Sequence, residues 1–249
     1  MDDREIPLSD HLEELRHRIF VIAGTVLAGF MAAYVVARPV LRWILLVVGA
    51  HHVVAVGVTE TFFAILEVAF ILGLVAASPV ILYQLAAFVL PGLTAQERRI
   101  VSIVFVPGLG LFVAGCAAGF FLIVPTVLRI MLSFTGQGIT ALFTISSVMQ
   151  FILTLTLPFG LVAELPLVAG VLAYLGILAP GWFERQRRYA IVIAFGIAAI
   201  LAPPDALSMI LMAIPIYLIY ELSAVVVRVA YRRRVTYSYD DVPGAGEEH

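Results

Sequence analysis

The chain has 249 residues, of which 62% are hydrophobic and only 13% are charged. Because soluble domains carry about 25% charged residues, this composition excludes a soluble globular protein and indicates an integral membrane protein. The formal net charge of −2 gives no sign of nucleic-acid binding, and the single cysteine, Cys116, excludes an intramolecular disulfide.

The chain opens with a short charged segment, 7–18, which runs directly into an apolar one. Its apolar residues recur every three or four positions, which predicts a helix with one apolar stripe. Glu14 and Arg18 are four residues apart, and such a pair stabilises a helix by about 0.2–0.5 kcal/mol. Two interpretations stay open: the segment anchors the first membrane span at the surface, or it presents a carboxylate there to a basic partner.

Six apolar runs follow, and they predict membrane spans at 19–37, 61–90, 100–131, 147–176, 189–202 and 206–227. We expect a loop at 38–60, with a short helix that is too brief to cross. The fifth run has about 14 residues, which rise about 21 Å against a hydrocarbon core of about 30 Å. That run therefore requires a thinned bilayer or burial against partners.

An even number of spans places both termini on the same side of the membrane. On this assumption the opposite side carries only Arg38, Arg42 and Arg129, three of the fifteen basic residues. Because cytoplasmic loops are enriched in arginine and lysine, we predict that both termini are cytoplasmic. The predicted organisation is a cytoplasmic amphipathic helix at 1–18, a six-span domain at 19–228 and a flexible cytoplasmic tail at 229–249.

Several acidic residues lie inside these runs or next to their ends, and three of them, Glu164, Glu67 and Asp205, are candidates for polar contacts there. Glu164 falls near the middle of the fourth run, where a charged carboxylate costs about 2.5–3.5 kcal/mol. It is therefore expected to be protonated, paired or open to water, either as a hydrogen-bonding link to a neighbouring span or as a functional group in a cavity. Glu67, two helical turns below Glu60, is expected to be half-buried. Asp205 is expected to cap the sixth span.

The sequence carries no signature of an enzyme. Its histidines are not arranged with acids at metal-ligand spacing, and there is no Gly-rich phosphate loop and no Gly-x-Ser-x-Gly motif. We therefore predict a protein without catalytic activity, metal or cofactor. An alternative is a proton-coupled small-solute transporter with Glu164 as the relay, and a third possibility is a structural subunit of a larger complex.

Five short motifs occur in order along the chain: His11–Arg16, Ser78–Gln84, Glu97–Arg99, Glu164–Pro166 and Pro203–Asp205. Each is modest alone, but together they are specific, and with them the chain resembles the TatC family, the multispanning receptors of the twin-arginine translocation system. The resemblance implies an all-α polytopic membrane protein with six transmembrane helices in a curved, glove-like arrangement. It also implies cytoplasmic termini and short fifth and sixth spans.

The same resemblance implies a function. The chain would be the signal-peptide receptor and core subunit of the Tat translocase in the cytoplasmic (inner) membrane. This translocase exports folded proteins whose signal peptides carry consecutive arginines, and it uses the proton-motive force. The implied partners are TatA- and TatB-type single-span subunits, twin-arginine signal peptides, the lipid bilayer and further copies of the chain, with no nucleic acid.

Site residues follow from the resemblance as well. In the family, a glutamate of the first motif and one between the second and third spans form the recognition site, and here these are Glu14 and Glu97. Arginine–carboxylate pairs are bidentate and directional, which lysine cannot reproduce. Other residues would line the path or hold the acids: Arg16, Phe88, Pro91, Arg98 and Arg99. Polar or partner contacts inside the membrane would involve Glu164, Glu67 and Asp205.

Some positions depart from the family pattern as we expect it. Glu67 stands where a basic or neutral residue is expected, and Met209 stands where some relatives have glutamine. Glutamine commonly anchors a partner helix in a membrane. The resemblance therefore does not support a partner contact at Met209.

Overall fold

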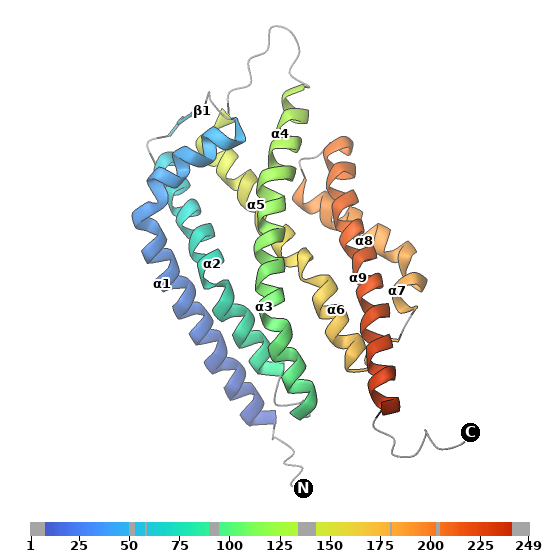
Figure 1. The fold of residues 1–249 in the computed structure, drawn as a ribbon. Coiled ribbons are helices and arrows are strands. Elements are labelled where there is room, and N and C mark those ends of the chain that lie inside the picture. The colour runs from blue at the N-terminus through green and yellow to red at the C-terminus, as the bar shows by residue number, and fades with distance from the viewer. Residues whose placement is uncertain are drawn as a thin grey trace, which may run out of the picture.

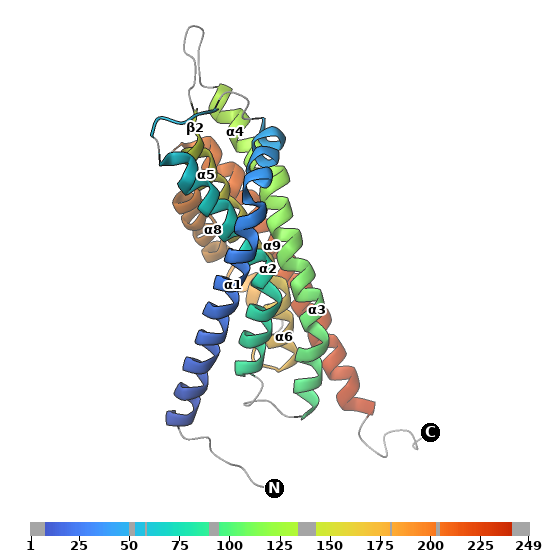
Figure 2. The ribbon, with the colours of Figure 1, turned by 90° about the vertical axis from the view of Figure 1, so that its left-hand side faces the viewer.

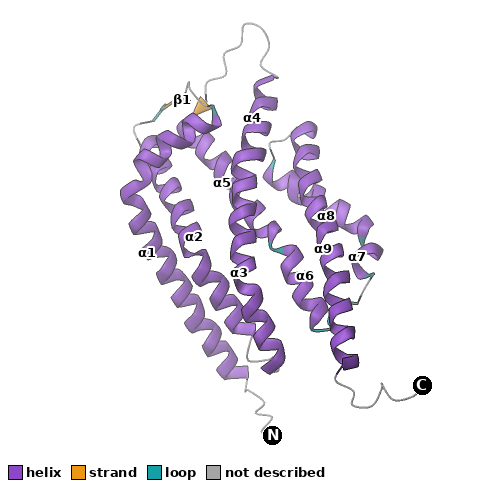
Figure 3. Cartoon of the chain, in the orientation of Figure 1, coloured by secondary structure: helices purple, strands orange, loops and turns teal. Residues whose placement is uncertain are grey.

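The structure is a computed structural model, drawn in Figure 1. It describes residues 8–49, 53–57, 59–89, 95–133, 143–179, 181–202 and 205–240, and within these ranges the side chains of 8–11, 89, 95–103 and 233–240 are left aside. The described chain is almost entirely helical, with one pair of two-residue strands (Figure 3). The predicted all-α fold is confirmed.

The first helix, α1, runs from Leu8 to Val48 without interruption. The prediction of a loop beginning at 38 is therefore wrong, because the helix continues through Pro39. A proline removes one backbone hydrogen bond and bends a helix, but the backbone in a membrane has no water as an alternative partner. The last turns of α1 accordingly stay helical and lean across the top of the molecule in Figure 1.

The second and third spans follow the predicted runs closely. After β1 (Val53–Val54), the helix α2 spans Glu60–Val89. The third run is one helical rod made of α3 (Ala95–Ala118), a π-helical turn called η2 (Gly119–Ile123) and α4 (Val124–Ser133). Strand β2 (Phe143–Thr144) then pairs in parallel with β1.

The fourth run divides into two helices, which the sequence analysis did not predict. Helix α5 spans Ile145–Ala163 and α6 spans Leu165–Tyr174, with Glu164 between them. Pro166 lies in the first turn of α6. It has no N–H to donate to the preceding turn, which explains why the helix breaks here.

The last part of the chain contains α7 (Trp182–Arg185), α8 (Arg187–Leu201) and α9 (Ala206–Asp240). The fifth run is short, as predicted, because α8 has 15 residues. The expectation of a short sixth span is wrong, since α9 has 35 residues and its apolar part covers Ala206–Arg232. The helix also continues into the predicted tail, as far as Asp240.

Within the described residues, five helical stretches are long and apolar enough to cross a membrane. These stretches, together with the shorter α8, run alternately toward one end of the molecule and toward the other (Figures 1 and 2). The beginning of α1 and the end of α9 lie at the same end, which also holds the end of α2 and the beginning of α3. The strand pair and the beginning of α5 lie at the opposite end. A multi-pass membrane protein is therefore the fold that the structure supports.

Two apolar clusters hold the helices together. The larger gathers buried residues of α1, α2, α5, α8 and α9 around η2 and α4, and the smaller joins α6, α7 and α9. Helix α1 packs mainly against α2. They approach each other closely at Gly29 and Gly73, where a Cβ on Gly73 would lie 2.5 Å from the backbone nitrogen of Phe30.

Candidate functional site

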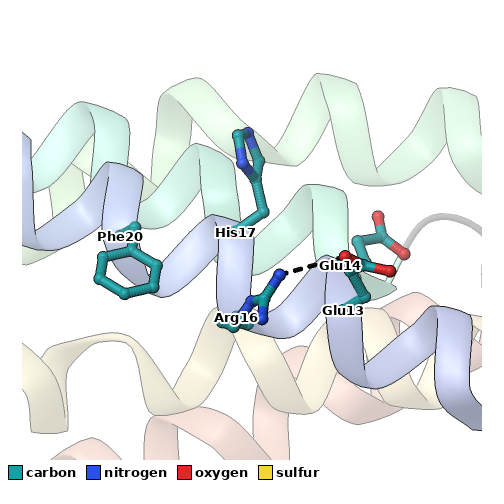
Figure 4. Close-up of a pocket in the computed structure, with 5 residues that line it drawn as sticks. All are labelled: Glu13, Glu14, Arg16, His17 and Phe20. Atoms are coloured by element: carbon teal, nitrogen blue, oxygen red, sulfur yellow. Dashed lines mark hydrogen bonds and ion pairs between the residues drawn. The ribbon is translucent and has the colours of Figure 1, made fainter.

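The candidate site lies on the first turns of α1. A pocket of about 590 Å³ is lined by Glu13, Glu14, Arg16, His17 and Phe20. Figure 4 shows these five side chains along one short stretch of α1, with the ion pair between Arg16 and Glu13 as a dashed line. The pocket therefore combines two carboxylates with an aromatic ring at the end of the molecule that holds the beginning of α1 and the end of α9.

The two carboxylates differ in how firmly they are held. Arg16 contacts Glu13 at 3.1 Å, but their side chains are 69% and 74% exposed. Exposed ion pairs of this kind contribute little, about 0–1 kcal/mol. Glu14 instead pairs with Arg18, and these side chains are only 29% and 18% exposed.

Arg18 connects Glu14 to the end of α2. Its Nε donates to Oε1 of Glu14 at 3.1 Å, and its Nη2 also bonds this oxygen. Its Nη1 donates to Oε1 of Gln84 at 2.9 Å, and Nη2 donates to the backbone oxygen of Ala87 at 3.0 Å. The predicted pairing of Glu14 with Arg18 is confirmed, but the contacts with α2 were not foreseen.

The second predicted carboxylate, Glu97, lies on the first turns of α3 together with Arg98 and Arg99. The side chains of all three lie outside the described residues, and so does Pro91. The beginning of α3 is at the same end of the molecule as the pocket on α1 (Figure 1). Phe88 is half-buried near the end of α2. That Glu14 and Glu97 together bind one ligand stays a prediction.

Sequence reasoning did not single out Gln84, His17 and Phe20. Gln84 belongs to the motif Ser78–Gln84, which was noted for the resemblance but not as part of the site. His17 and Phe20 lie in the opening helical stretch, one and two turns beyond Glu13. Their position at helical spacing from the acids is the signal that could have identified them.

Inside the membrane, Glu164 is buried at the break between α5 and α6 and is only 9% exposed. Its Oε1 has no hydrogen-bond partner among the described residues. A Cβ placed on Gly108 of α3 would lie 3.5 Å from its Oε2, so the absence of a side chain at Gly108 leaves room for the carboxyl group. A buried polar atom without a partner costs about 1–3 kcal/mol, which makes this position expensive for stability alone.

The other predicted polar residues have simpler environments. Glu67 is half-buried, as expected, and its Oε2 lacks a partner within the described part of the chain. Asp205 caps α9, because its Oδ1 accepts from the backbone N–H of Ser208 at 2.7 Å. Glu60 is bonded by three backbone N–H groups, those of Val56, Gly57 and Ser146. It thereby joins α2 to the beginning of α5.

A separate ionic network ties α7 and α8 to α9. Arg228 contacts Glu184 at 2.5 Å, and Arg187 contacts Glu221 at 2.8 Å. Glu221 also accepts from the hydroxyl of Tyr217 at 2.6 Å. A backbone hydrogen bond, followed by the neighbouring Arg228 guanidinium, lowers the pKa of Glu184 below its ordinary value. These contacts hold the short α8 against α9.

Comparisons with known proteins agree with this architecture. Residues 10–215 match the family model of the Sec-independent protein translocase protein (TatC). The chain is 38% identical over 226 residues to the Sec-independent protein translocase protein TatC of Carboxydothermus hydrogenoformans, covering 90% of this chain and 93% of that one. It is 32% identical over 237 residues to TatCy of Bacillus subtilis, with 94% and 93% covered.

A solved structure is also similar. The crystal structure of the twin arginine translocase receptor TatC has a TM-score of 0.79 and 33% sequence identity, covering 88% of this chain and 99% of that chain. The family match over residues 10–215 includes the pocket residues of α1, Glu164 and the short α8. The chain belongs to the TatC family of Sec-independent protein translocase proteins.

Proposed function

We propose that the chain is the twin-arginine signal-peptide receptor and core subunit of a Tat translocase. In this role it binds the signal peptides of folded proteins and takes part in their export across the cytoplasmic membrane, driven by the proton-motive force. The observation that carries the proposal is the pocket on α1, where two carboxylates lie beside an exposed aromatic ring. A similar solved protein is described as a twin arginine translocase receptor.

The chemistry of the pocket suits an arginine pair. A guanidinium has five N–H donors in a planar fork that matches a carboxylate, whereas a lysine ammonium is a compact point charge. Glu14 supplies one carboxylate, and Glu97, which begins the third span at the same end of the molecule, supplies the second. Arg16, Arg98 and Arg99 orient the acids or meet lipid headgroups, and Phe88 and Pro91 line the path of the peptide.

The remaining assignments concern orientation and partners. The excess of arginine at the end that holds the beginning of α1 and the end of α9 supports a cytoplasmic position for this end. Glu164 and Glu67, each with a buried carboxyl oxygen that lacks a partner among the described residues, are positions where a polar group of the signal peptide or a TatA- or TatB-type helix is accommodated. Self-association of the chain within the complex belongs to the same proposal.

Site-specific photocrosslinking to a twin-arginine signal peptide tests the receptor role. A photoreactive residue at position 20, in place of Phe20, leaves both acids intact and should crosslink to the peptide, and much less to a peptide with two lysines. The double variant Glu14→Ala and Glu97→Ala should lose crosslinking from this probe. Glu184→Ala is the matched control, because this acid lies outside the pocket, and it should crosslink like the wild type. Unchanged crosslinking in the double variant would refute the site.

A further inference from the structure

The contacts of Arg18 show how this part of the molecule binds a guanidinium. Three acceptors converge on Arg18: the carboxylate of Glu14, the amide oxygen of Gln84 and the backbone oxygen of Ala87. They come from two different helices, α1 and α2. We call these three groups the guanidinium cradle. Its occupant is only 18% exposed, so it lies largely out of water.

The sequence explains why the end of α2 can accept a cation. In a continuous helix the oxygen of Ala87 would accept from the N–H of residue 91, but residue 91 is a proline and has no N–H. The last turn of a helix also carries partial negative charge on such unpaired oxygens. The carbonyl of Ala87 is thus left for an external donor, and Gln84, one turn earlier, places a second oxygen beside it.

We propose that the cradle of Glu14, Gln84 and Ala87 is a binding position for one arginine of the ligand, and that Arg18 occupies it in the unliganded chain. This inference rests on the proposed receptor function and adds to it two acceptors on α2 and an internal competitor. On binding, a peptide guanidinium takes over the three acceptors, and Arg18 turns outward. Its long side chain can reach the aqueous surface while the methylene groups stay against the helix.

Competition of this kind has a defined consequence for affinity. A ligand that can bind only when the internal occupant has left binds more weakly, in proportion to the fraction of molecules with a vacant cradle. Occupancy by Arg18 also keeps Glu14 neutralised when no peptide is present, since a carboxylate left without its partner at a half-buried position is destabilising. The same geometry selects against lysine. The three acceptors are spread over two helices and suit the planar fork of a guanidinium, whereas a single compact ammonium cannot reach all of them.

The test compares peptide affinity in variants of Arg18, measured by fluorescence anisotropy with a labelled twin-arginine signal peptide and the full chain in nanodiscs. Arg18→Gln vacates the cradle and should tighten binding by on the order of tenfold, the factor that one hydrogen bond to a charged group typically contributes. Arg18→Lys keeps the positive charge but fits the cradle poorly, and should tighten binding by less. Arg228→Gln, which removes an arginine from the network on α9, is the control and should leave the affinity unchanged.

A second substitution tests the acceptors on α2. In the Arg18→Gln background, Gln84→Leu should weaken peptide binding again, because the incoming guanidinium loses one acceptor. If Arg18→Gln and Arg18→Lys both bind the peptide as well as or more weakly than the wild type, Arg18 orients Glu14 rather than competing with the ligand, and the inference is overturned. If the wild-type chain does not prefer the twin-arginine peptide over a twin-lysine peptide, the receptor proposal fails as well, so the two failures are distinguishable.

Discussion

The close approach of α1 and α2 at Gly73 allows one prediction to be worked out from the structure. A Cβ at this position would lie 2.5 Å from the backbone nitrogen and 2.7 Å from the Cα of Phe30. Both atoms are backbone, so no flexible side chain can move away. To restore a contact of 3.4 Å, α1 and α2 would have to separate locally by about 0.9 Å. Gly73→Ala therefore strains the main contact of α1.

The expected magnitude follows from the two effects of the substitution. Overpacking a tight contact costs about 1–3 kcal/mol, whereas replacing glycine by alanine inside a helix is favourable by about 1 kcal/mol. Gly24→Ala on α1 is the matched control, because a Cβ there meets nothing within 4 Å. The difference between the two variants isolates the steric effect, about 1–3 kcal/mol.

Thermal unfolding of both variants in the same detergent measures this difference. For chains of this size each kcal/mol shifts Tm by about 2–4 °C, so Gly73→Ala should melt several degrees below Gly24→Ala. The contact of α1 with α2 at Gly29 and Gly73 also sets the distance between Glu14 on α1 and Gln84 on α2. We therefore expect weaker binding of a twin-arginine peptide to Gly73→Ala. Equal melting temperatures of the two variants would contradict the close packing of α1 on α2.

Two further predictions concern single acids. Because the folded-state pKa of Glu184 lies below its ordinary value of 4.5, its contribution to stability is fully present above about pH 4.5 and is lost as the pH falls through the lower, folded-state value. Glu184→Gln should therefore flatten the acid side of the plot of Tm against pH, and an unchanged plot would refute a role for the contact with Arg228. At the break between α5 and α6, Glu164→Gln should retain more export of a twin-arginine substrate than Glu164→Ala, because the amide keeps the polar group in the buried position. Equal loss of export in both variants would show that the carboxyl group itself is required.

The opening of α1, the length of α8 and the cap at Asp205 illustrate which local features a sequence can predict. The charged opening of α1 carries its acids and apolar residues at helical spacing, so the helix and the Glu14–Arg18 pair could be predicted from neighbouring residues alone. The shortness of α8 followed in the same way from the length of its apolar run. Asp205 was recognisable as a cap because it directly precedes the last span.

Other features depended on contacts between distant segments. The helix α1 continues through Pro39, whereas the fourth run breaks next to Pro166, so the presence of a proline alone does not tell whether a helix is interrupted. The side-chain bonds of Arg18 with Gln84, 66 positions away, required the packing of α1 on α2. This packing depends in turn on two glycines whose proximity no local pattern reveals.

The amino-acid sequence by itself determined the membrane class, the approximate spans and the family, because hydrophobicity, charge asymmetry and short motifs are local properties. Only the tertiary structure decided that Arg18, the partner of Glu14, also bonds Gln84 and the backbone oxygen of Ala87. Hydrogen bonds between side chains depend on positions to within a few tenths of an ångström, and such positions are set by helix packing rather than by the order of residues along the chain.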